Sequence, residues 1–184
     1  PVVFGALYVY VALGVLNQVV SKAAESFGFV CAEWTTAATG PGEMLVSDAC
    51  HPTGEQVMAG ETYRIRLSVT EPWFDGAVPA SPKGLENQHV GDRLVGMLAV
   101  PLRRHIAEGW FTVMAKVDRS GLDSRALALR PVANAGTGVW EADFTADVAG
   151  ELLLYVNDGL LLGWDDPYAD NMGRAEIAIE LKAR

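Results

Sequence analysis

The stretch TYRIRLSVT, residues 62–70, alternates strictly between apolar and polar side chains. Its apolar positions are Tyr63, Ile65, Leu67 and Val69. Successive side chains of a strand point to opposite faces, so this period of two predicts a half-buried antiparallel strand.

The same kind of pattern recurs along the chain. Gly173 opens a second alternating segment, whose expected inward positions are Ala175, Ile177, Ile179 and Leu181. Further strands are expected near residues 110–117, 125–129, 139–145 and 151–156. Short strands separated by Gly, Pro and Asp turns predict a mainly β fold, a jelly-roll-like antiparallel β-sandwich.

The amino-terminal segment has a different character. The run from Val2 to Leu16 contains no strongly polar residue, and no charge precedes Lys22. A membrane-spanning helix needs roughly 20 mostly apolar residues, so this segment predicts a transmembrane or anchoring helix and a membrane-associated protein. A buried core helix and an oligomerisation helix are the alternatives. We expect a hydrophobic helix at residues 1–28, a linker and first strand at 29–45, and the sandwich at 46–184.

The amino-acid composition bears on the possible binding partners and on disulfide formation. The net charge of −9 disfavours nucleic acid, because phosphate binding needs a basic surface. Two cysteines, Cys31 and Cys50, could form one disulfide in an oxidising compartment, and two buried thiols fit the sequence equally well.

Carboxylate and amide side chains crowd the segment 157–171. They are Asn157, Asp158, Asp165, Asp166, Asp170 and Asn171. Such a cluster indicates calcium, which takes six to eight oxygen ligands, or paired-carboxylate catalysis, or a solvated turn. Catalysis is disfavoured, because all the carboxylates share one loop, and we predict no catalytic residue in this chain. Spacing alone leaves calcium and the solvated turn open.

One ordered set of residues runs through this segment and into the strand after it. It comprises Gly150, Glu151, Leu152, Tyr155, Val156, Asn157 and Asp158, then Tyr168, Asn171 and Gly173. Upstream, Thr53-Gly54, Gly60, Tyr63 and the turn Trp73-Phe74-Asp75-Gly76 extend it. This set resembles the PA-I-type galactose-binding lectin family. The resemblance implies calcium at one end of the sandwich, where the ion and its ligands hold sugar hydroxyls.

The resemblance also implies a set of site residues. The calcium ligands would be Asp158, Asp170, Asn171, a backbone carbonyl near Pro167 and another in the turn around Asp75. For the saccharide we expect contacts from Asn157 and Tyr168, with Trp164 and Trp73 stacking on the sugar ring; core packing is the alternative for both tryptophans.

Three departures separate this chain from a simple galactose lectin. The loop from Asp158 to Asn171 is longer than the family's, and within it Trp164-Asp165-Asp166 is extra material that would cover or reshape the sugar position. The family's His-Pro-x-Gln sugar contact has no match where residues 86–89 stand. The resemblance therefore favours calcium more than galactose.

We predict a calcium-dependent module that binds a carbohydrate or glycolipid head group and is appended to a larger bacterial protein. One alternative is a sandwich that has lost its ligand and serves oligomerisation or partner contact. Another is an accessory domain of an upstream lipase-like hydrolase, in which case the chemistry lies outside this chain.

Overall fold

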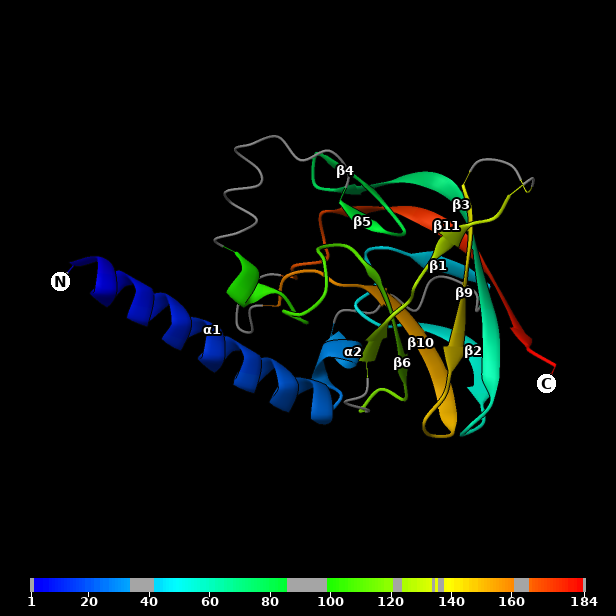
Figure 1. Ribbon diagram of the computed structural model, residues 1–184, viewed down its shortest axis with the longest axis horizontal. Coiled ribbons are helices and arrows are strands. Elements are labelled where there is room, and N and C mark those ends of the chain that lie inside the picture. Colours follow the sequence, from blue (N-terminus) through cyan, green and yellow to red (C-terminus); the bar gives the residue numbers. More distant parts are fainter. Residues whose placement is uncertain are drawn as a thin grey trace.

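Two antiparallel sheets face each other, and a long helix precedes them (Figure 1). The computed structural model describes residues 2–33, 42–85, 99–120, 124–133, 135, 138–160 and 166–183. The arrangement confirms the predicted mainly β, antiparallel sandwich.

The elements follow one another in chain order. The helices are α1 (Val2–Ser26), α2 (Phe29–Glu33) and the short 3-10 helix η1 (Val100–Leu102). The strands are β1 (Glu43–Leu45), β2 (His51–Val57), β3 (Thr62–Asp75), β4 (Val78–Ser81), β5 (Gly84–Leu85), β6 (Val113–Val117), β7 (Ser124–Ala126), β8 (Arg130–Pro131), β9 (Val139–Thr145), β10 (Gly150–Val156) and β11 (Asn171–Leu181).

The larger sheet is organised around β3. Its main order is β1-β11-β3-β4-β5, and β9 also pairs with β3 and carries β8 on its other side. The first half of β3 pairs with β9, and its last three residues pair with β4. The smaller sheet has the order β2-β10-β6-β7. One 14-residue strand therefore joins the body of the larger sheet to the β3–β4 turn at its end.

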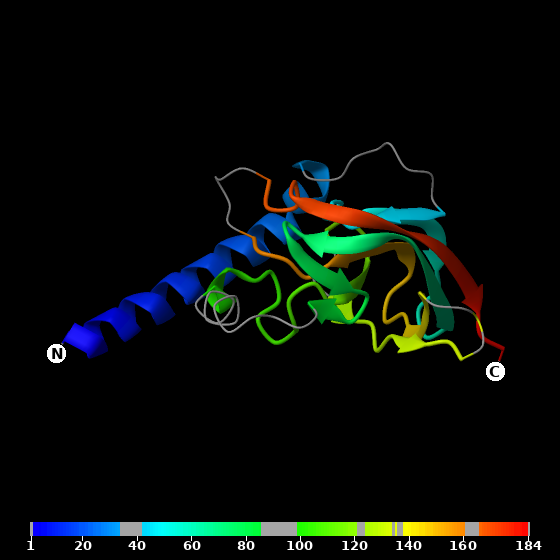
Figure 2. The same ribbon diagram turned by 90° about the horizontal axis from the view of Figure 1, so that it is seen from above.

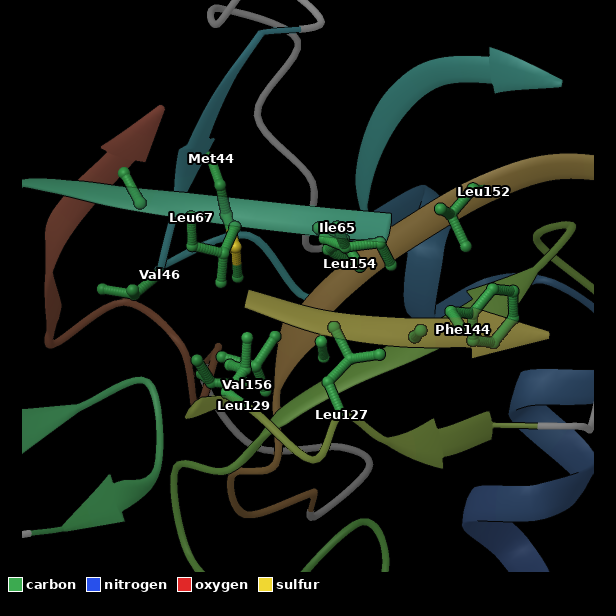
Figure 3. Close-up of a cluster of buried hydrophobic side chains, with 14 of the residues drawn as sticks. Met44, Val46, Ile65, Leu67, Leu127, Leu129, Phe144, Leu152, Leu154 and Val156 are labelled. Atoms are coloured by element: carbon green, nitrogen blue, oxygen red, sulfur yellow. The ribbon is translucent and has the colours of Figure 1, made fainter. Parts of the chain in front are cut away.

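The core lies between the two sheets (Figure 3). Ile65 and Leu67 from β3 meet Leu154 and Val156 from β10 there, and all four are fully buried. The predicted inward face of β3 is thus confirmed. Leu181 was expected inward but is 61% exposed, because it is the last residue of β11.

The outer face of the smaller sheet is also covered. Residues 152–156 of β10 are buried at every position, not at alternate ones. Leu153 points outward and packs against the disulfide formed by Cys31 and Cys50. The disulfide connects α2 to the start of β2, so the two cysteines pair and are not separate thiols.

Helix α1 docks on the sandwich through a partly polar face. Gly14 contacts Pro101 so closely that an added Cβ would lie 2.8 Å from the proline Cβ. Asn17 Nδ2 donates to the carbonyl oxygen of Pro101 over 3.1 Å, and Gln18 Nε2 donates to that of Arg103 over 2.5 Å. These contacts hold the middle of α1 against η1, while its amino-terminal half projects beyond the sheets (Figure 2).

The expected transmembrane helix is not supported. Within the part of the chain that the structure describes, no helix combines the length and apolarity needed to cross a bilayer. Asn17, Ser21 and Glu25 lie buried along one side of α1, where they face protein. The apolar positions of the other side are exposed, among them Val9, Leu13, Leu16 and Val20.

A lysine lies buried on the outer face of the smaller sheet. Lys116, in β6, is fully buried, and its Nζ has no hydrogen-bond partner. Burial lowers its pKa, the nearby Arg104 adds to the fall and Glu25 opposes it, and the resulting pKa is about 8. An unpaired buried ammonium is unfavourable, so the folded protein holds this proton less tightly than the unfolded chain does.

Replacing this lysine should therefore stabilise the protein. The folded-state pKa is about 8 and the ordinary value is 10.5, so the stability contributed by neutral Lys116 is present above pH 10.5 and is lost as the pH falls through 8. Lys116→Met should raise the free energy of unfolding at pH 7 by about 1–3 kcal/mol, and by less at pH 9.5. Urea unfolding at both pH values measures this, with the exposed Lys182→Met as control. A variant less stable than wild type at pH 7 would contradict the expectation.

Candidate functional site

Three segments meet at one end of the sandwich, where β10 ends, β11 begins and β3 turns into β4. Asn171 opens β11 and pairs with Asp75, the last residue of β3. The backbone N–H of Gly76 donates to the carbonyl oxygen of Asp170 over 3.3 Å. Asp158, just after β10, accepts a hydrogen bond from Asn171 Nδ2 over 2.7 Å. Four of the five predicted calcium ligands therefore come together.

The β3–β4 turn lies close to Asp170, and this close approach requires glycine at position 76. Gly76 has a φ of 55°, in the left-handed region that favours glycine. A Cβ at this position would lie 3.2 Å from Asp170 Oδ2. The absence of a side chain thus lets the turn and the carboxylate of Asp170 lie side by side.

The carboxylates of this group disfavour one another's ionisation. Asp158 is 6% exposed, and burial raises its pKa to about 7, with Asp75 and then Asp170 adding to the rise. Burial also raises the pKa of Asp75, and Asp170 contributes. Hydrogen bonds from Asn171 and from the Gly159 N–H, 2.6 Å from Asp158 Oδ1, only partly offset these effects. In the described part of the chain, no lysine or arginine forms an ion pair with any of the three acids.

One buried oxygen at the site has no partner. Asn171 is 4% exposed; its Nδ2 donates to Asp158, but its Oδ1 accepts no hydrogen bond from any residue that the structure describes. A buried acceptor left unsatisfied costs about 1–3 kcal/mol, and a cation would satisfy it. Among the described residues, no three His, Cys, Asp or Glu side chains are arranged to hold a metal by themselves. A cation here would need amide and carbonyl oxygens as well, which is the ligand set of calcium.

The turn before Asp170 is built by another acid. Asp166 Oδ1 accepts a hydrogen bond from the Tyr168 N–H over 2.9 Å, and the Asp166 carbonyl oxygen accepts from the Ala169 N–H over 3.2 Å. Pro167 lies within this turn and is half-buried. Asp166 thus shapes the turn, and among the described residues no hydrogen bond joins Pro167 to the acidic group. Trp164 and residues 86–89 lie outside the described residues.

Two residues that were expected to contact the saccharide instead form hydrogen bonds inside the protein. Asn157 is fully buried; its Oδ1 accepts from the His105 N–H, and its Nδ2 donates to three carbonyl oxygens between residues 105 and 109. Tyr168 is also fully buried, and its hydroxyl donates to the Val156 carbonyl oxygen over 3.0 Å. Both side chains hold loops in place and present no polar atom at the surface.

Trp73 packs in the core and does not stack on a sugar ring as expected. It is 2% exposed, and its Nε1 donates to the Arg174 carbonyl oxygen over 3.2 Å. Its ring lies so close to β11 that a Cβ on Gly173 would lie 2.5 Å from it. Trp73 therefore joins β3 to β11 and offers no face for a sugar ring.

A buried acid–imidazole pair lies at the start of β2. Asp48 Oδ2 and His51 Nδ1 are 3.0 Å apart, both side chains are fully buried, and His51 Nε2 has no hydrogen-bond partner. No pattern in the sequence predicted this pair. The only signal was the spacing of three residues between an aspartate and a histidine, which is common by chance.

The fold and this end of the molecule define a class, an antiparallel β-sandwich with an acidic group where its two sheets end. No known family model matches the chain, and no curated protein matches it. Solved structures do match, including one described as "EclA N-terminal domain; PllA-like lectin". That structure is 18% identical, the match covers 77% of this chain and 94% of that chain, and the TM-score is 0.45. A similarity of this degree implies nothing about a ligand, so the site rests on its own geometry.

A second carboxylate in place of the Asn171 amide should be unfavourable without a cation. Asn171→Asp removes the donor to Asp158 and sets two carboxylates against each other, so in chelator at pH 7 it should lose about 1–3 kcal/mol of unfolding free energy. Urea unfolding measures this. Gln56→Glu, an amide-to-acid change at an exposed position of β2 opposite Glu151, is the control and should lose less, because there the two carboxylates face solvent. Equal stability of Asn171→Asp and wild type would contradict the geometry.

Proposed function

We propose that the acidic end of the sandwich binds calcium. The observation that carries this proposal is the buried, unpartnered Oδ1 of Asn171 beside Asp158, a carboxyl group whose ionisation is already disfavoured. A divalent cation would accept that oxygen as a ligand and would remove the repulsion among the acids. Asp158, Asp170 and Asn171 would supply side-chain oxygens, and the Asp75 turn and the Pro167 turn would supply carbonyl oxygens.

We further propose that the loaded site holds a saccharide through its hydroxyls. Asp158 and Asn171 are buried, whereas Asp170 is exposed, so an ion among them would face solvent on the Asp170 side. Calcium accepts six to eight oxygens, and hydroxyls of a sugar can replace its waters. The order of residues shared with PA-I-type lectins favours this use of the ion. Sugar specificity would have to come from residues other than the expected ones, because the side chains of Asn157, Tyr168 and Trp73 are buried inside the protein.

The alternative function is a sandwich without a ligand. It is favoured by one observation, the complete internal use of the polar atoms of Asn157 and Tyr168. In that case the acids at the end of the sandwich form a solvated turn, and calcium would leave stability unchanged.

Calcium should raise the melting temperature. At a hundred times its dissociation constant a ligand adds about 2.7 kcal/mol, which corresponds to roughly 5–10 °C for a domain of this size. The increase should be lost in Asp158→Ala and kept in Glu55→Gln, an exposed acid on β2. Thermal melts of the full chain in calcium chloride and in excess chelator measure it. If wild type melts at the same temperature in both, calcium is not its ligand, and the alternative function holds.

Saccharide binding is tested next, on the calcium-loaded protein. A glycan array probed in calcium and again in chelator should give signals that disappear with the ion. The Asp158→Ala protein provides the matched blank. Signals that persist in chelator would place saccharide binding elsewhere on the molecule.

A further inference from the structure

A single arginine connects helix α1 to the candidate calcium site. The guanidinium of Arg104 is fully buried, and its Nε donates to Glu25, near the end of α1. Burial opposes ionisation of Glu25, but Arg104, with His105 and Lys116, outweighs it, so the pKa of this carboxyl lies below its ordinary value. Both groups are therefore charged, and they form a buried ion pair.

The other nitrogens of the Arg104 guanidinium contact the segment before β2 and the turn before β11. Nη1 donates to the Ala49 carbonyl oxygen over 2.6 Å and to the Tyr168 hydroxyl over 3.3 Å. Nη2 lies 3.5 Å from Cys50 Sγ, and the guanidinium carbon lies 3.8 Å from the centre of the Tyr155 ring. The planar fork of an arginine allows all these contacts only in one orientation. Glu25 is one of the groups that set that orientation.

The backbone of the same residue contacts the site directly. The Arg104 N–H donates to the Asp158 carbonyl oxygen over 2.9 Å. The neighbouring Leu102 carbonyl oxygen accepts from the Leu160 N–H over 2.7 Å, which continues this pairing. The segment that carries Asp158 is thus fixed by the backbone around Arg104, and the turn that carries Asp170 is fixed by its side chain through Tyr168.

We propose that Arg104 is the positioning residue of the calcium site, and that Glu25 makes docking of α1 and binding of calcium favour each other. This inference rests on the proposed function. When α1 leaves the sandwich, a buried guanidinium loses its counter-charge and must find water, which releases its contacts with Ala49 and Tyr168. The two segments that supply the calcium ligands then lose a common support. A ligand that binds one arrangement better must also stabilise that arrangement.

The first test compares calcium affinity in full-length variants by calorimetric titration with calcium chloride. Glu25→Gln should weaken binding roughly 5- to 20-fold, within the usual range of coupling between sites. Arg104→Lys keeps the charge but loses the fork and should weaken binding at least as much. Glu55→Gln removes an exposed acid and should bind as wild type does. The affinity is measured well below the melting temperature of each variant, so that loss of folding does not enter the result.

The second test uses a signal that a purely structural role would not change. If the two events are coupled, calcium must slow amide hydrogen exchange in residues 21–26 of wild type, and this protection must shrink in Glu25→Gln. Equal calcium affinity in wild type and Glu25→Gln, with no calcium-dependent protection of α1, would overturn the coupling and leave the calcium site standing. No calcium binding by wild type would overturn the proposed function and the coupling together. Glu25→Gln thus tests the coupling even if Arg104→Lys fails to fold.

Discussion

The structure depends on one buried positive charge. Arg104 lies under α1, over the Tyr155 ring, and its guanidinium contacts parts of the chain that are far apart in sequence. Burying a charge is unfavourable unless the charge is paired and hydrogen-bonded, and no single one of these parts supplies all the partners of the guanidinium. The Arg104 guanidinium therefore supports three parts of the chain at once: helix α1, the segment before β2 and the turn before β11. The pKa of Arg104 stays above its ordinary value despite burial, because Tyr155, Tyr168 and Glu25 all favour the cation.

Periodic patterns made the sheets predictable. The alternation from residue 62 onward corresponds to β3, and the strand expected at residues 139–145 has the same bounds as β9. The acidic group was predictable for a related reason. Asp158 follows one strand and Asn171 opens the next, so a loop that returns to the same end of the sandwich must bring them close.

Orientation and long-range charge were not predictable. Asn157 and Tyr168 have the residue types of a sugar site, but nothing local indicates that their side chains point inward. Glu25 and Arg104 are 79 residues apart and belong to no common motif. The apolar run of α1 fits a bilayer by composition, yet small and polar residues at Gly14, Asn17 and Ser21 line one face that packs on protein. Composition counts residues and does not record which side of the helix they occupy.

The disulfide has a consequence for covalent topology. Cys31 follows α1 in sequence and Cys50 precedes β2, so the bridge closes the chain between them into a ring. A single cut of the backbone anywhere between these two cysteines opens the ring but leaves the helical segment bonded to the sandwich. Such a nicked molecule would keep its mass, apart from one added water, in a non-reducing gel or spectrum. Only reduction would then divide it into two polypeptides, so a cut between the two cysteines would release the helix only in the presence of a reductant.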